Sequence, residues 1–189
     1  MGEIAGVSTI PSSQLDGVEG CGASVFKAGF IMSSIAMDGF CWTDELLLGN
    51  TRMDEEHRTF ALLIRGLLDA PDDALAVALD ELVAHATQHF EEEDAWMRKL
   101  SFPAQECHMQ EHAAVLMSAA GVRRRLRDGE FRAVRQFAAE LAAWFPPHLQ
   151  HLDSALAHWI CKHAWGGKPL VFRRNTPSTE AFVNAHVLL

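Results

Sequence analysis

Four stretches of this chain place apolar side chains at every third or fourth position, which is the spacing of one face of an α-helix. They cover residues 54–69, 73–100, 104–127 and 130 to about 163. No stretch shows the alternation of apolar and polar side chains that a half-buried strand requires. Each run therefore predicts an amphipathic helix that must bury one face against a partner.

The links between these predicted helices are short and contain residues that end helices. Pro71 and Pro103 follow the first two runs, and Gly129 follows the basic last turn of the third. Short links place consecutive helices side by side and antiparallel. We therefore expect an all-α protein, an up-down-up-down antiparallel four-helix bundle around one core.

The helical pattern occupies the middle of the chain, which we divide into three parts. Residues 1–38 are rich in glycine, serine and other small residues and show no period, so we expect a loosely ordered N-terminal leader. Residues 39–164 form the predicted bundle, and residues 165–189 form a C-terminal tail of mixed composition. With 49% hydrophobic residues in 189, the chain can bury one sizeable core.

Charge and composition exclude several classes of partner. The formal net charge is -9, and the basic residues form no stripe interleaved with aromatic residues, so we expect no nucleic-acid binding. The apolar segment 28–37 is broken by two serines and lacks a clean cleavage site, so we expect neither secretion nor membrane insertion. The four cysteines are scattered, without metal or redox spacing, which is typical of a cytoplasmic protein.

Ligand-type side chains interrupt the predicted apolar faces. His89 and Glu93 are four residues apart, as are His108 and His112, so each pair lies side by side on one face of a helix. Burial of an ionised glutamate without a partner would cost several kcal/mol, whereas a metal ion supplies the opposite charge. The pattern therefore indicates a metal site inside the bundle.

Similar residues on the other predicted helices argue against coincidence, although a single histidine pair is more often a solvated or packed pair. The candidate ligands are His57, His89, Glu93, His108, His112, His148 and Asp153. Imidazoles and carboxylates without a thiolate suit iron, manganese or zinc, and seven ligands exceed what one tetrahedral zinc uses. We expect two metal ions that share both carboxylates.

The last pair of candidate ligands does not follow from helix geometry. His148 and Asp153 are five residues apart, about 140° around an ideal α-helix, so they should not face one point. Pro146 and Pro147 precede them, and two prolines within a helix predict a kink or a restart beside His148.

The chain resembles the bacterial hemerythrins, which are oxygen-binding proteins with a non-haem di-iron centre in a four-helix bundle. The resemblance covers about residues 40–160. It rests on the stretches 42–49, 53–57 and 89–93, on the pair His108 and His112, and on Trp144-x-x-x-His148 followed five residues later by Asp153. The family's fourth-helix ligands are likewise a histidine and an aspartate five apart.

The resemblance implies a particular distribution of ligands over two iron ions. It places His108, His112 and His148 on one iron and His57 and His89 on the other. Glu93, Asp153 and a single oxygen would bridge the irons, and the second iron would keep an open position for dioxygen. The apolar pocket around that position would consist of Phe60, Phe90, Trp144, Phe145 and Leu149. A tyrosine common in the family is replaced here by His85, and the chain contains no tyrosine.

The resemblance thus implies reversible dioxygen binding without catalytic residues, for oxygen storage, delivery or sensing. The partner would be dioxygen, together with an oxygen-consuming enzyme or a signalling protein. The alternative is a di-iron enzyme on the same bundle, such as a peroxidase, a nitric-oxide reductase or an oxidase. Carboxylate-rich di-iron enzymes on bundles use Glu-x-x-His motifs, and this chain has none, which counts against the alternative.

Overall fold

The computed structural model describes residues 40–167 and residue 171. Four long helices form the bundle: α1 (Thr51–Asp69), α2 (Leu75–Lys99), α3 (Gln105–Arg127) and α4 (Phe131–His148). A π turn, η3 (Leu149–Asp153), joins α4 directly to α5 (Ser154–Trp165), and a short 3-10 turn, η2 (Asp44–Leu46), precedes α1. These bounds lie close to the predicted ones, except that α1 begins three residues earlier than expected.

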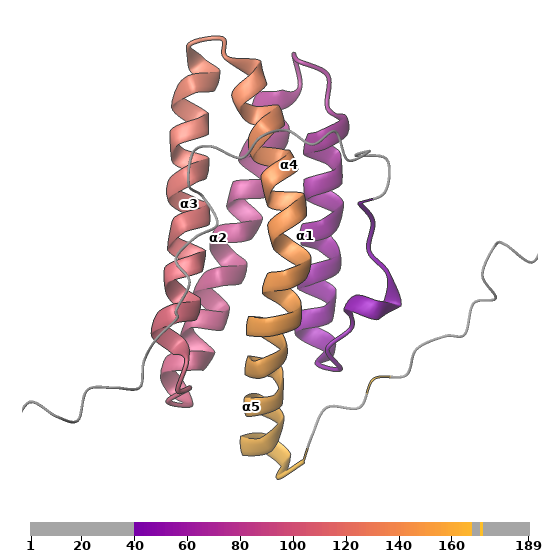
Figure 1. Cartoon of the computed structure of the whole chain (residues 1–189), viewed down its shortest axis with the longest axis vertical. Coiled ribbons are helices and arrows are strands. Elements are labelled where there is room, and N and C mark those ends of the chain that lie inside the picture. The colour runs from indigo at the N-terminus through magenta and orange to yellow at the C-terminus, as the bar shows by residue number, and fades with distance from the viewer. Residues whose placement is uncertain (1–39, 168–170, 172–189) are drawn as a thin grey trace, which may run out of the picture.

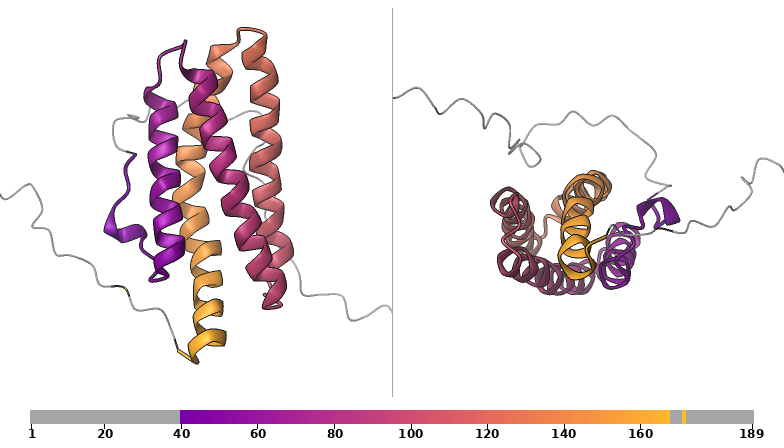
Figure 2. Two further views of the ribbon diagram at one scale, coloured as in Figure 1. Left: turned by 180° about the vertical axis from the view of Figure 1, so that it is seen from behind. Right: turned by 90° about the horizontal axis from the view of Figure 1, so that it is seen from below.

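Consecutive helices pack side by side, and α1 also packs against α4, which closes the bundle (Figures 1 and 2). The predicted all-α antiparallel four-helix bundle is therefore confirmed. Its core consists mainly of aliphatic and phenylalanine side chains from one face of each helix, as the helical spacing predicts. The predicted leader, and the tail beyond residue 167 apart from residue 171, lie outside the described residues.

Local hydrogen bonds explain the early start of α1. The Asn50 side chain accepts a hydrogen bond from the Met53 N–H at 3.3 Å, which caps the first turn. The carboxylate of Asp54 accepts the N–H groups of Leu48 and Gly49 at 2.7 and 3.0 Å. These bonds attach the segment that enters the bundle to the first turn of α1, so the helix begins before its apolar pattern does.

The predicted fourth helix is continuous in direction but not in helix type. The helical backbone runs through Pro146 and Pro147, and the irregularity follows at η3, where the Ser154 N–H donates to the Leu149 carbonyl in an i→i+5 bond. The expected kink or restart thus takes the form of a π turn just after His148. Gly166, in the left-handed conformation with φ of 66°, ends α5.

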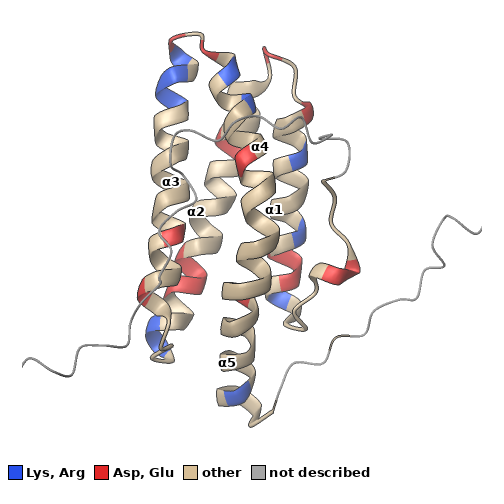
Figure 3. Cartoon of the chain, viewed as in Figure 1, with Lys and Arg blue, Asp and Glu red and all other residues tan. Residues whose placement is uncertain are grey.

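Positions of lysine, arginine, aspartate and glutamate are marked along the helices in Figure 3. Among the acids, Asp54, Glu93 and Asp153 are buried. Arginines Arg124, Arg125 and Arg127 occupy the last turn of α3, where they complement the negative end of the helix dipole. Within the described residues, no helix is both long and apolar enough to cross a membrane.

Candidate metal centre

Every long helix contributes to one buried cluster of polar side chains. The contributors are His57 from α1, His89 and Glu93 from α2, His108 and His112 from α3, His148 from α4 and Asp153 from η3. None of the seven side chains is more than 4% exposed. The structure therefore brings together all seven predicted ligands, and it does so inside the apolar core.

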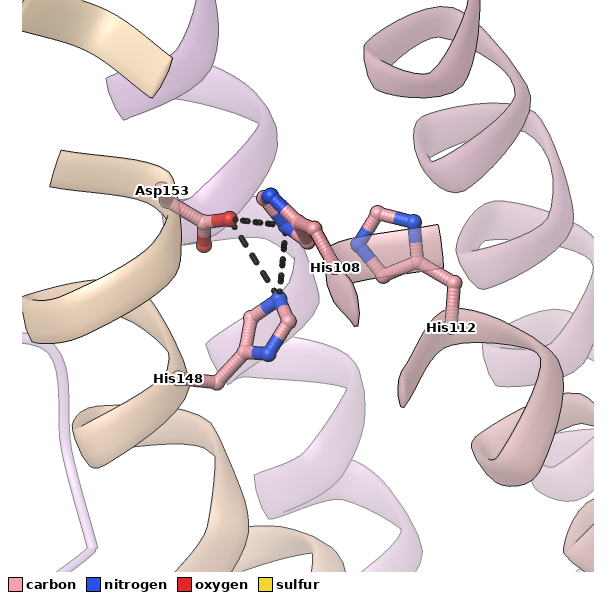
Figure 4. Close-up of side chains that lie close together, drawn as sticks. All are labelled: His108, His112, His148 and Asp153. Carbon is pink, nitrogen blue, oxygen red and sulfur yellow. Dashed lines mark hydrogen bonds and ion pairs between the residues drawn. The ribbon is translucent and has the colours of Figure 1, made fainter. Parts of the chain in front are cut away.

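The π turn explains how His148 and Asp153 face the same point. A π turn bonds residues five apart, so it aligns positions i and i+5 where an α-helix aligns i and i+4. His148 Nε2 lies 3.3 Å from Asp153 Oδ1, and His108 Nε2 lies 2.9 Å from the same oxygen (Figure 4). The spacing that helix geometry left unexplained is thus a consequence of one extra residue in the turn.

The seven side chains form two groups, each compact enough to hold a cation. His108, His112, His148 and Asp153 form one, which we call the three-histidine half. His57, His89 and Glu93 form the other, the two-histidine half. In each group the candidate ligand atoms all lie within 4.8 Å of one another. This division agrees with the ligand distribution that the family resemblance implies.

The two carboxylates extend from one half to the other. Glu93 Oε2 lies 3.6 Å from His108 Nε2 and 3.5 Å from His112 Nε2, whereas Glu93 Oε1 lies 3.6 Å from His57 Nε2 and 3.8 Å from His89 Nε2. Asp153 Oδ1 faces His108 and His148, and its Oδ2 lies 3.3 Å from His57 Nε2. Each carboxylate therefore presents one oxygen to each half, which is the arrangement of a bridging ligand.

Many polar atoms at the centre have no hydrogen-bond partner. Both oxygens of Glu93 and of Asp153 are buried and form no well-directed hydrogen bond, although imidazole nitrogens lie close to them, and Nε2 of His57 and of His112 are in the same position. Buried polar groups in folded proteins are normally hydrogen-bonded, because leaving one unpaired costs about 1–3 kcal/mol. These atoms lie close together in one cluster. Imidazole nitrogens and carboxylate oxygens are metal-ligand atoms, so the cluster fits divalent or trivalent metal cations.

Protonation of histidines balances the carboxylates in the absence of a cation. Burial lowers the pKa of His57, but Asp153 and Glu93 outweigh it and raise the pKa to about 10. Burial likewise opposes the charged form of His148, yet the charge of Asp153 raises that pKa to about 9. Burial and the nearby Asp153 raise the pKa of Glu93. The two acids thus favour positive charge on the neighbouring imidazoles, which is the charge that a metal cation would supply.

Two further carboxylates hold the histidines from outside the cluster. Asp94 Oδ1 lies 3.0 Å from His112 Nδ1, and Glu111 Oε2 lies 3.0 Å from His148 Nδ1. Neither residue is among the ligands predicted from the sequence. The available signal was that each acid directly neighbours a predicted ligand in the chain, Asp94 after Glu93 and Glu111 before His112.

The predicted pocket residues are all buried, but they lie against different parts of the centre. Phe145 packs edge-on against His57 with ring centroids 5.8 Å apart, and Phe60 lies 6.1 Å from His89. Phe60 and Phe145 also contact each other at 5.0 Å. These two rings therefore cover the two-histidine half.

The other predicted pocket residues lie elsewhere around the cluster. Phe90 stacks on His112 at 4.1 Å, and Trp144 lies 4.2 Å from His148, so both rings cover the three-histidine half. Phe90 also contacts His89 at 5.6 Å. Leu149 is fully buried in η3.

His85 borders the two-histidine half. Its ring stacks against His89 with centroids 6.1 Å apart, and its Nε2 lies 3.1 Å from the Glu56 carbonyl oxygen. A hydrogen bond to a carbonyl requires that Nε2 carries the proton. His85 therefore acts as a hydrogen-bond donor between α1 and α2, at the place where the resemblance expects a tyrosine.

Fold and site together define a helical metal-binding protein, with a centre of histidines and carboxylates inside a four-helix bundle. The family model that matches is the hemerythrin HHE cation binding domain, over residues 48–160. The chain belongs to the hemerythrin family.

Named relatives agree with this membership. A bacteriohemerythrin of Ralstonia nicotianae is 36% identical over 121 residues, which cover 64% of this chain and 88% of that protein. A hemerythrin-like protein of Naegleria gruberi is 26% identical over 122 residues, or 65% of this chain and 94% of that protein. No solved structure matches the chain.

Proposed function

We propose that this protein binds dioxygen reversibly at a non-haem di-iron centre. The observation that carries the proposal is the pair of carboxylates, each with one oxygen toward each histidine group. Such carboxylates suit two cations held close together. Iron would supply the electrons that dioxygen takes up on binding and returns on release.

The ligand set is unequal, and this inequality supports a binding position for a small molecule. One half offers three imidazoles and the other only two, in addition to the shared carboxylates. With five neutral imidazoles and two acids, the protein supplies less negative charge than a carboxylate-rich site. Such a set favours lower iron oxidation states, and therefore reversible binding over oxygen-atom insertion.

Apolar side chains exclude water from the two-histidine half. Phe60 and Phe145 are at most 1% exposed and lie against His89 and His57. Dioxygen is apolar and enters such a pocket readily, whereas a hydrated ion or a polar substrate loses its hydrogen bonds there. The structure therefore suits a small apolar ligand at this half.

We propose three uses for such binding: oxygen storage, delivery to an oxygen-consuming enzyme, or sensing through a separate signalling protein. A cytoplasmic location is consistent with all three. Neither nucleic acid nor membrane insertion belongs to the proposal.

The decisive experiment combines metal analysis with optical spectroscopy of the reduced, oxygenated and deoxygenated protein. We expect two irons per chain and a visible charge-transfer band that appears with dioxygen and disappears on its removal. The His89→Ala variant should lose the reversible band, whereas His158→Ala, which alters an exposed histidine of α5, should keep it. Stoichiometric zinc, or an irreversible band, would contradict the proposal, and turnover of a defined substrate would favour the di-iron enzyme.

A further inference from the structure

The two halves of the centre differ in how the protein supports their histidines. In the three-histidine half, carboxylates outside the cluster contact two of the three imidazoles through Nδ1. The third imidazole of that half, His108, and His57 in the two-histidine half each have a buried Nδ1 without a hydrogen-bond partner. The supporting carboxylates, Asp94 and Glu111, are not among the seven candidate ligands.

Glu111 is the more strongly built of the two supports. Its Oε2 lies 3.0 Å from His148 Nδ1 and also accepts the indole N–H of Trp144 at 3.0 Å. Trp144 and His148 are one turn apart on α4, and their rings lie 4.2 Å apart. One oxygen on α3 therefore contacts both of these neighbouring rings on α4 and fixes the direction of His148 Nε2.

Asp94 supports His112 in the same way. Its Oδ1 lies 3.0 Å from His112 Nδ1, and its other oxygen accepts a hydrogen bond from Arg98 at 3.3 Å. The ring of Phe90 stacks on the imidazole of His112, with ring centroids 4.1 Å apart and planes 7° from parallel. The imidazole is thus held both in its plane and across its face.

The chemistry of these contacts favours metal binding. A carboxylate that accepts the Nδ1 proton selects the tautomer with a free lone pair on Nε2, and it raises the basicity of that nitrogen. His112 Nε2 is buried and unpartnered, and His148 Nε2 points to Asp153.

We propose that Glu111 and Asp94 are positioning residues that make the three-histidine half the tighter metal position, so that the two metals bind in sequence. The inference rests on the two-metal centre of the proposed function but not on dioxygen binding. It assigns a role to two acids outside the ligand set, and it predicts a half-loaded protein with its metal on His108, His112 and His148.

Cobalt(II) serves as the probe, because its visible absorption reports coordination in the absence of iron and dioxygen. The full chain is loaded with two equivalents, and an excess of chelator then removes the metal. We expect two phases of one cobalt each, with the fast phase absent in His89→Ala. Glu111→Ala should accelerate the slow phase by about 10–100-fold, the usual loss when such a support is removed.

Graded variants separate positioning from packing. Glu111→Gln retains an oxygen that can accept both hydrogen bonds but removes the charge, so we expect a smaller acceleration of the slow phase. Asp94→Asn should behave similarly. The control is Glu106→Gln, an exposed position on α3, the helix that also carries Glu111, and this variant should leave both phases unchanged. Thermal unfolding of the metal-free variants checks that they fold; should Glu111→Ala fail, Glu111→Gln and Asp94→Asn carry the test.

Several results would overturn the inference. They are a single release phase in the unmodified chain, a slow phase that disappears in His89→Ala, or equal acceleration of both phases in the Glu111 and Asp94 variants. Unchanged release in all of these variants would overturn it as well. A chain that binds two cobalt ions with equal strength would refute the inference alone, whereas a chain that binds no cobalt would refute the two-metal centre too.

Discussion

His148 and Asp153 are five residues apart in the chain, yet His148 Nε2 lies 3.3 Å from Asp153 Oδ1 because η3 is a π turn. The turn contains one residue more than an α-helical turn, and the wider turn accommodates this residue. A change in the length of the turn therefore tests whether the register is what assembles the centre.

Deletion of Gln150, an exposed residue of η3, should convert the π turn to an α-helical turn and place the two ligands four apart. We expect this variant to fold and to keep its metal, because residues four apart also share a helix face. Insertion of an alanine after Gln150 should rotate Asp153 by about 100° and abolish metal binding. Metal analysis and circular dichroism measure both effects, and retention of two metals in the insertion variant would contradict the expectation.

Replacement of Glu93 by methionine should separate stability from metal binding. Glu93 is fully buried, and burial together with Asp153 raises its pKa, so the metal-free protein gains little from it. We expect Glu93→Met to lose the metal but to raise the free energy of unfolding of the metal-free chain by about 1–4 kcal/mol. Urea titration gives this energy, with Glu91→Met at an exposed position of the same helix as the control. A destabilised Glu93→Met chain would show that the carboxylate supports the fold even without metal.

Bound metal should stabilise the fold. The ligands come from four helices and a turn, so a cation joins elements that are far apart in the chain. At free metal 100 times the dissociation constant, each site adds about 2.7 kcal/mol to the free energy of unfolding. We expect a chelator to lower the melting temperature, and readdition of iron(II) without oxygen to restore it. Equal melting temperatures of loaded and stripped protein would speak against the centre.

Phenylalanines on the two-histidine half should protect it from water, and Trp144 on the other half should not. Phe145→Ala removes a fully packed ring beside His57, so we expect a loss of about 3–5 kcal/mol in stability and faster irreversible oxidation of the iron. Phe145→Leu should show the faster oxidation at a smaller cost in stability. Trp144→Phe keeps an aromatic ring near His148 and should leave the oxidation rate nearly unchanged. Similar rates in the Phe145 and Trp144 variants would refute this division of the pocket.

The four helical stretches and most of their bounds could be predicted from the chain, because apolar spacing is a local signal, but the division of the fourth into α4, η3 and α5 could not. The pairs His89 with Glu93 and His108 with His112 were predictable for the same reason, since four residues make about one turn of helix. The pair His148 with Asp153 followed only from the family resemblance and not from helix geometry, because a π turn depends on how α4 and α5 pack against the core. Asp94 and Glu111 also escaped prediction, since surface-facing acids are common and only the distance to a histidine on another helix distinguishes these two.

The sequence by itself determined that four amphipathic helices carry seven ligand-type side chains in their apolar faces. Only the tertiary structure decided which oxygen of Glu93 and Asp153 faces which histidines, which rings cover which half, and which acids support the imidazoles. The physical reason is that helix periodicity is a property of neighbouring residues. Contacts across the bundle depend instead on the rotation and offset of each helix, and the packing of the whole core sets these together.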